Sequence, residues 1–179
     1  SCYTLTTTDF KPMKIILSIL IFSFFSVGFA QTSNNNLNSQ LQLMKKYFLE
    51  RNFAEYSNFV YPKVIEIYGG KEKMILLSQT SIKKMEAQGY SILDISFKDP
   101  SKFITEGNET QFSITQELTI QSPKGKMVSE FTLIGISIDN GENWKFIDTA
   151  GRTKDKIIQK FPNLNAEIII NPIQQKFID

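Results

Sequence analysis

The sequence predicts an α+β domain, with three helices followed by a mostly antiparallel sheet of four to five strands. Two patterns in the apolar residues support this class. Before residue 90 they recur at the three- and four-residue spacing of helices, whereas over residues 111–121 they alternate with polar residues, as in a half-buried strand. A third observation is the Asn140-Gly141 pair, which is typical of the tight turn of an antiparallel hairpin.

The first residues of the chain are predicted to lie outside the folded domain. Met13 and Lys14 precede an apolar run that ends in small residues at Ala30, the pattern of a secretory signal peptide over residues 13–30. We interpret residues 1–12 as an upstream extension. The apolar run is short for a membrane span, so we expect an exported protein, periplasmic or extracellular, with no membrane span after signal cleavage. An uncleaved N-terminal anchor is the alternative.

The composition of the predicted mature chain excludes several functions. Removal of the first 30 of the 179 residues, which contain Lys11, Lys14 and Asp9, leaves 18 basic and 17 acidic side chains. This balance, with scattered basic residues, does not favour binding to nucleic acid or to an anionic membrane. The chain has no histidine, and its one cysteine is Cys2. We therefore exclude Ser-His and Cys-His catalysis and expect neither a metal nor a cofactor.

The first helix is predicted from apolar residues at helical spacing. Leu41, Met44 and Phe48 form its apolar stripe, with Leu37 one turn earlier, and it ends near residue 51. Residues 31–38 are rich in Asn and Ser and are predicted to form a disordered spacer. Residues 39–179 are predicted to form a single domain with a C-terminal arm.

Two further helices follow. The second is short and begins at the capping residue Asn52, and Pro62 interrupts it, because a residue before proline is disfavoured in a helix. Residues 64–68 form either another helical turn or a short strand. The third helix covers residues 71–88, between Gly69-Gly70 and the C-terminal cap Gly89.

The rest of the chain is predicted to form the sheet and its cover. Strands are expected over residues 90–98, 102–105, 111–121, 127–138 and 144–149. A short helix then reaches residue 161. The apolar segment over residues 164–177 has no clear period, and we expect it to pack along the outside as a strand or an extended arm.

The register of the sheet follows from the hairpin. If Asn140-Gly141 is the whole loop, Gly135 pairs with Phe146 and Leu133 with Asp148, and Gln116 lies opposite Phe131; a one-residue slip would turn Asp148 outward. This register predicts an apolar, aromatic wall with a few polar groups. The candidate pocket residues are Tyr56, Phe112, Ile114, Gln116, Phe131, Leu133, Trp144, Phe146 and Asp148.

Residues 137–144 also resemble the Asp box, the S-x-D-x-G-x-x-W hairpin motif of sialidase-like propellers. In that family the motif is a structural turn that recurs once per blade and is not the catalytic site. It occurs once in this chain, which has no internal repeat and is too short for a propeller. The resemblance therefore predicts a hairpin and not sialidase activity.

The order of the predicted elements over residues 37–149 resembles the NTF2-like, SnoaL-like superfamily, a cystatin-related cone. The order is helix, helix, Gly-Gly turn, helix, then strands that end in Trp144-x-Phe146-Ile147-Asp148. The segment from Tyr61-Pro62 to Gly69-Gly70-Lys71, with residues 139–144 later, is similar to secreted bacterial members of unassigned role. The resemblance implies that the helices pack in the concave face of a curved sheet and enclose a pocket. Members include isomerases, hydrolases, dehydratases, protein-binding subunits and ligand carriers. Several of its enzymes use an Asp or Tyr with a His, which this chain lacks.

Two functions are predicted from the pocket. The first is non-catalytic binding of an apolar small molecule, or a protein interaction, by a secreted domain; Asp148 would then be a structural cap, and aromatic side chains could fill the cone. The alternative is a cofactor-independent acid–base enzyme of isomerase, hydrolase or dehydratase type. In it Asp148 is the general base, and Tyr56 or Tyr47 donates to an oxyanion.

The outer face of the sheet suggests a further interaction. Ile134, Ile136 and Ile147 face outward on the predicted register. Either the C-terminal arm covers them in the same molecule, or a second subunit covers them in a homodimer.

Overall fold

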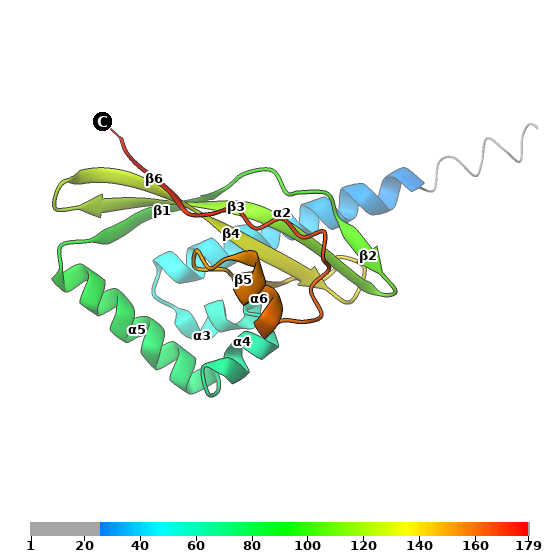
Figure 1. The fold of residues 1–179 in the computed structure, drawn as a ribbon, viewed down its shortest axis with the longest axis horizontal. Coiled ribbons are helices and arrows are strands. Elements are labelled where there is room, and N and C mark those ends of the chain that lie inside the picture. The colour runs from blue at the N-terminus through cyan, green and yellow to red at the C-terminus, as the bar shows by residue number, and fades with distance from the viewer. Residues whose placement is uncertain (1–25, 179) are drawn as a thin grey trace, which may run out of the picture.

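The computed structural model describes residues 26–178 and has the predicted α+β class. Within these residues, helices come first and an open antiparallel sheet of six strands follows (Figure 1). The helical elements are α2 (Ser26–Leu49), α3 (Phe53–Tyr56), the 3-10 helix η1 (Ser57–Phe59), α4 (Pro62–Ile67), α5 (Lys71–Ala87) and α6 (Lys154–Lys160). The strands are β1 (Ser91–Phe97), β2 (Ile104–Glu106), β3 (Glu109–Ser122), β4 (Gly125–Ser137), β5 (Lys145–Asp148) and β6 (Gln174–Phe177).

The start of the described chain differs from the prediction. Residues 1–12 and most of the predicted signal peptide lie outside the described residues. The prediction of a disordered spacer over residues 31–38 is wrong, because these residues are helical and belong to α2. Leu37 is buried and anchors this part of the helix, and neither Asn nor Ser prevents helix formation. No helix within residues 26–178 is both long enough and apolar enough to cross a membrane.

Four α-helices, not three, precede the sheet in the described part of the chain. The predicted interruption at Pro62 is correct, but a new helix starts there. Tyr61 has a non-helical backbone, with φ −59° and ψ 132°, and Pro62 occupies the first turn of α4. Proline ends the preceding element by disfavouring a helical residue before it, yet its own fixed φ suits the start of a helix. The ambiguous residues 64–68 are therefore helical as far as Ile67.

Strands β3 and β4 form the long centre of the sheet. β1 and β2 pair one after the other along β3, and β5 and β6 pair one after the other along the opposite edge, on β4. The sixth strand, β6, exceeds the four to five predicted for the sheet and lies in the C-terminal arm, for which a strand was one of the two predicted forms. All four β6 side chains are exposed, so no apolar alternation marks this strand in the sequence.

The predicted register is confirmed. The structure contains all three predicted pairs: Gly135 with Phe146, Leu133 with Asp148, and Gln116 with Phe131. Directly opposed residues of antiparallel strands point to the same side of the sheet. Asp148 therefore lies on the same face as Leu133.

The loop between β4 and β5 is longer than two residues, but the two strands keep the register predicted for a two-residue loop. Asn140 and Gly141 both have positive φ, 59° and 85°, as a type I′ turn requires. Asp139 Oδ1 accepts hydrogen bonds from Ser137 Oγ at 2.8 Å and from the Asn143 N–H at 2.9 Å. Burial by itself would raise the pKa of Asp139, but the bonds from Asn143 and Ser137 lower it below its usual value. The Asp-box-like residues thus form a structural turn.

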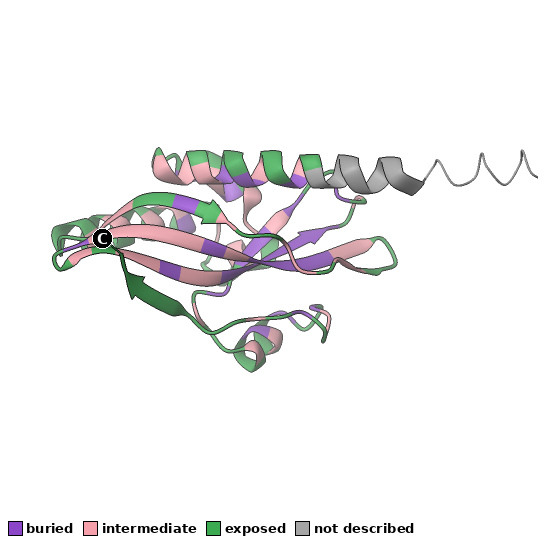
Figure 2. Cartoon of the chain, turned by 90° about the horizontal axis from the view of Figure 1, so that it is seen from above, coloured by how far each residue is buried: buried purple, intermediate pink, exposed green. Residues whose placement is uncertain are grey.

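Helix α2 covers one face of the sheet (Figure 2). Its Leu37, Leu41 and Met44 are buried in a core with side chains from the sheet and its last hairpin: Phe112, Ile114, Leu133, Trp144 and Phe146. The Phe112 and Trp144 rings meet edge to face, with centroids 5.0 Å apart and an interplanar angle of 85°. Aromatic pairs prefer this geometry. This core is the inner face of the domain.

The C-terminal segment covers the opposite face (Figure 2). Ile134, Ile136 and Ile147 are buried in a second core with side chains that follow β5: Ile157, Phe161, Leu164 and Ile168. Of the two predicted covers, the arm of the same molecule is therefore the one observed. The apolar surface from which the homodimer was predicted is thus covered by the same chain.

Gly135 permits the close approach of Phe112 on the neighbouring strand. The two residues are opposite partners, and a Cβ atom at Gly135 would overlap the Phe112 ring. Phe112 is fully buried and contacts the rings of Phe103 and Trp144. The ring thus has no free space into which it could turn.

We expect Gly135→Ala to lower the free energy of unfolding by on the order of 3 kcal/mol, the cost of overpacking a dense core. Chemical denaturation followed by the fluorescence of Trp144, the one tryptophan, measures this loss. The control is the double variant Gly135→Ala with Phe112→Leu, which should recover part of the stability relative to Phe112→Leu alone. A neutral Gly135→Ala would contradict the packing argument.

Candidate functional site

The candidate site is a cleft at the end of the inner face, which we call the Asp148 cleft. It has a volume of about 280 Å³ and lies where α4 and α5 face the end of β5. Most of its lining is apolar: Phe48, Phe53, Val60, Val64, Met74, Leu77, Ile82, Phe146 and Ala150. Its polar lining residues are Tyr68, Ser78, Ser81, Asp148 and Arg152.

Helix α5 forms the outer wall of the Asp148 cleft. Gly69 and Gly70, with φ values of 85° and 106°, turn the chain sharply before the helix begins. Met74 is the one α5 residue that is fully buried. An ion pair of 2.8 Å between Arg51 and Glu86 ties the far end of α5 to the end of α2. Because α5 buries little of its surface, much of its inner stripe is available to line a cleft.

Asp148 is held at the cleft by the turn that follows β5. Its Oδ1 accepts the N–H of Ala150 at 2.7 Å, and Ala150 has a positive φ of 48°. This hydrogen bond stabilises a backbone conformation that a non-glycine residue rarely adopts. Asp148 is exposed to solvent. The protein atoms near its carboxyl raise the pKa of Asp148, while the Ala150 N–H and the positive charge of Arg152 act to lower it.

Tyr56 lies near Asp148 but is not among the residues that line the cleft. Its ring packs edge to face with Phe48 and Phe53, at centroid distances of 5.4 Å and 6.4 Å. Burial raises the pKa of Tyr56 far above its ordinary value, and the negative charge of Asp148 raises it further. Tyr56 is therefore a neutral phenol at physiological pH. Tyr47, the alternative donor, also does not line the cleft; its ring lies 6.2 Å from that of Phe59.

Most of the predicted pocket wall is a filled core. Phe146 and Asp148 line the Asp148 cleft, but four other predicted pocket residues are buried beneath α2: Phe112, Ile114, Leu133 and Trp144. Gln116 is also buried, Phe131 is half-buried, and neither lines the cleft. Of the two alternatives predicted for the cone, open to a ligand or filled by its own aromatic side chains, the centre of the inner face is filled. The physical reason is that α2 and Phe103 occupy the space in front of the sheet.

Several residues of the cleft were not predicted from the sequence. Arg152 comes from the turn after β5, and Tyr68, Met74 and Leu77 come from the segments on either side of the Gly-Gly turn. The signal that could have indicated them is this turn, because it folds α5 back along α4. No sequence pattern marks Arg152 as a cleft residue, because its position depends on the backbone turn that the Asp148 side chain stabilises.

A second cleft continues from the first, and we call it the α6 cleft. Its volume is about 170 Å³, and it shares Val64, Tyr68, Asp148 and Arg152 with the Asp148 cleft. The rest of its lining comes from α4, β5 and α6 and their ends: Ile67, Ile147, Ile157, Lys160 and Phe161. The two clefts thus meet at Asp148 and Arg152.

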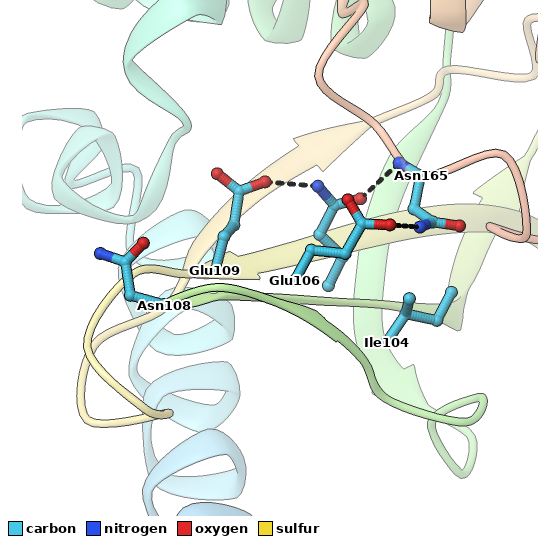
Figure 3. Close-up of a pocket in the computed structure, with 6 residues that line it drawn as sticks. Ile104, Glu106, Asn108, Glu109 and Asn165 are labelled. Atoms are coloured by element: carbon cyan, nitrogen blue, oxygen red, sulfur yellow. Dashed lines mark hydrogen bonds between the residues drawn. The ribbon is translucent and has the colours of Figure 1, made fainter.

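A third, polar pocket of about 310 Å³ lies at the β2–β3 hairpin (Figure 3). Its buried Gln111 donates to the Glu109 carboxylate, and its Oε1 accepts the Asn165 N–H at 2.8 Å. The Asn165 side chain in turn donates to Glu106 Oε1 at 2.6 Å (Figure 3). These polar groups bind one another and attach the C-terminal arm to the sheet. We assign them a structural role.

The described residues give no support for a metal centre, since they contain no group of three or more acidic, His or Cys side chains that could hold an ion. Comparison of the chain with models of known protein families finds no match. A search among proteins of curated function likewise finds no significant similarity.

We expect Asp148→Asn to change how stability depends on pH. A carboxyl whose pKa is raised by folding stabilises the protein fully below its unfolded pKa of about 4, and this stabilisation is lost as pH rises through the folded pKa. Asn keeps the acceptor for the Ala150 N–H but has no charge. The variant should therefore match the wild type at pH 3 and become the more stable of the two toward pH 7, as measured by urea denaturation.

The control for this comparison is Asp148→Ala, which has no acceptor for the Ala150 N–H. It should be less stable than Asp148→Asn by about 1 kcal/mol at every pH. A stability difference between wild type and Asp148→Asn that does not change with pH would contradict the raised pKa.

Proposed function

We propose that this chain is an exported, non-catalytic binding domain of the NTF2-like, SnoaL-like type, which holds an apolar small molecule in the Asp148 cleft. The observation that carries the proposal is the composition of the cleft. Its lining is mostly apolar, and its few polar groups converge at one end of β5. Small-molecule sites in proteins typically have this combination of an apolar wall and a few placed polar groups.

The volume and openness of the site also favour a small ligand. The Asp148 cleft, at about 280 Å³, is just below the usual range of about 300–1,000 Å³ for ligand pockets, and it adjoins the α6 cleft. Leu77 and Tyr68 line it while remaining partly exposed. Exposed apolar side chains around a cleft favour an apolar occupant, because binding removes them from water.

The assignment to the NTF2-like type has its own support. Three features agree with the expected cone. They are a helix across the inner face, a Gly-Gly turn before the last N-terminal helix, and a cleft beside the final strand of the hairpin. Export to the periplasm or the extracellular space is supported by the signal-peptide pattern over residues 13–30.

The neutral fluorophore N-phenyl-1-naphthylamine tests the proposal, because its emission increases in apolar surroundings. We expect it to bind the secreted, purified protein. Leu77→Glu should weaken the affinity about tenfold or more, since it puts a charge into the apolar wall. The matched control is Leu76→Glu, next to it on α5. Leu76 is 61% exposed, against 41% for Leu77, and does not line the cleft. No binding, or equal loss in both variants, would overturn the proposal.

A second candidate function is the acid–base enzyme. The observation in its favour is that Asp148, with its raised pKa, lines a mostly apolar cleft. In this mechanism Asp148 removes a proton from the bound substrate. The donor to the oxygen on which charge develops is a group other than the two predicted tyrosines, since neither Tyr56 nor Tyr47 lines the cleft. The reaction needs no metal and no cofactor.

Proton exchange distinguishes the two functions. Compounds that co-purify with the secreted protein would be identified by mass spectrometry and incubated with it in D2O. An acid–base enzyme should convert them or exchange an acidic C–H for deuterium, and Asp148→Asn should stop this while the fluorophore still binds. Compounds that bind but remain unchanged would favour the carrier function.

A further inference from the structure

The Asp148 cleft and the α6 cleft adjoin, and the lining residues that they share are Val64, Tyr68, Asp148 and Arg152. We call the two adjoining clefts together the groove; its charged groups lie where the clefts adjoin and at the α6 end. Apart from the shared residues, the Asp148 cleft is lined by apolar residues and two serines. The α6 cleft contains Lys160 in addition to the shared Arg152.

The charge balance of the groove favours an anion. Its charged lining consists of one carboxylate, Asp148, and two cations, Arg152 and Lys160. The carboxylate is already bound by the Ala150 N–H at 2.7 Å, and it lies at the junction and not at the α6 end. Both cations remain largely exposed to solvent. Arg presents a planar fork of N–H donors that fits a carboxylate group.

We propose that the groove binds a linear amphiphile with a single carboxylate head, whose apolar chain lies in the Asp148 cleft and whose head lies between Arg152 and Lys160. The inference rests on the proposed function and names the class of ligand. The apolar chain contacts the α5 wall, where Met74, Leu77 and Ile82 meet Phe146 from the sheet. The proposed ligand is a free, monomeric amphiphile and not a membrane lipid, because the Asp148 cleft, at about 280 Å³, is small for a ligand pocket.

Displacement of N-phenyl-1-naphthylamine from the secreted, purified protein tests the head group. Three probes share a twelve-carbon chain and differ in charge: dodecanoate, dodecan-1-ol and dodecyltrimethylammonium. We expect dodecanoate to bind at least tenfold more tightly than either of the others at low ionic strength. The protein should not co-sediment with vesicles of neutral or anionic phospholipid; co-sedimentation with vesicles together with no binding of dodecanoate would overturn the free-amphiphile proposal.

Substitutions that each remove one positive charge locate the carboxylate head of the ligand. Arg152→Gln and Lys160→Gln should each weaken dodecanoate binding about fivefold or more while leaving dodecan-1-ol unchanged. The matched control is Lys156→Gln, which removes an exposed charge from the same helix α6 but does not line the groove. Arg152→Glu should reverse the preference, so that dodecyltrimethylammonium binds more tightly than dodecanoate.

The outcomes separate this inference from the proposed function. If the fluorophore binds but dodecan-1-ol competes as well as dodecanoate, the head-group proposal is overturned and the apolar cleft remains. If Lys156→Gln weakens dodecanoate as much as Arg152→Gln does, the charge effect is non-specific and the assigned head position is overturned. If the fluorophore itself does not bind, the proposed function fails and this inference fails with it.

Discussion

Burial of β4 on both faces is the constraint on which the rest of the structure depends. Leu133 and Ile134 are adjacent in this strand and point to opposite sides, and both are almost completely buried. An open sheet with apolar residues on both faces needs a separate cover for each. Helix α2 supplies the inner cover and the C-terminal segment supplies the outer one. The N-terminal helix and the C-terminal segment thus pack on opposite faces of the same strand. Loss of either cover would expose several large aliphatic side chains to water.

The same constraint decides where the protein can hold a ligand. In front of the middle of the sheet, Phe112 lies over Gly135 and packs against Trp144, and α2 closes this aromatic core. On the inner face of the described chain, the Asp148 cleft lies beyond this core, where the short helices and α5 turn away from the sheet (Figure 1). The Asp148 cleft is thus the uncovered end of the inner face. Its walls are apolar because they continue the core, and its polar groups come from the turn after β5.

The turn after β5 places the two charged side chains of the Asp148 cleft. Asp148 stabilises the strained backbone of Ala150 by accepting its N–H, and the chain then places Arg152 beside the carboxylate. One short segment thus provides both a structural hydrogen bond and two charges at the junction of the two clefts. The structural hydrogen bond of Asp148 leaves its carboxyl accessible, because one oxygen accepts the Ala150 N–H while the residue is exposed to solvent. A carrier and an acid–base enzyme would use the same carboxylate differently, and the protonation of a bound compound separates them.

The sequence by itself determined the class, the strand order of the central hairpins and the register that places Asp148 on the inner face. These features are local: alternation sets the faces of a strand, and Asn140-Gly141 sets the turn that joins β4 to β5. The tertiary structure alone decided that α2 fills most of the predicted pocket, that the chain's own arm covers the outer isoleucines, and that Arg152 and Lys160 share a groove with Asp148. These outcomes depend on contacts between segments far apart in the chain. No local periodicity encodes how much space a helix leaves in front of a sheet, because that space is set by side-chain volumes from several elements at once.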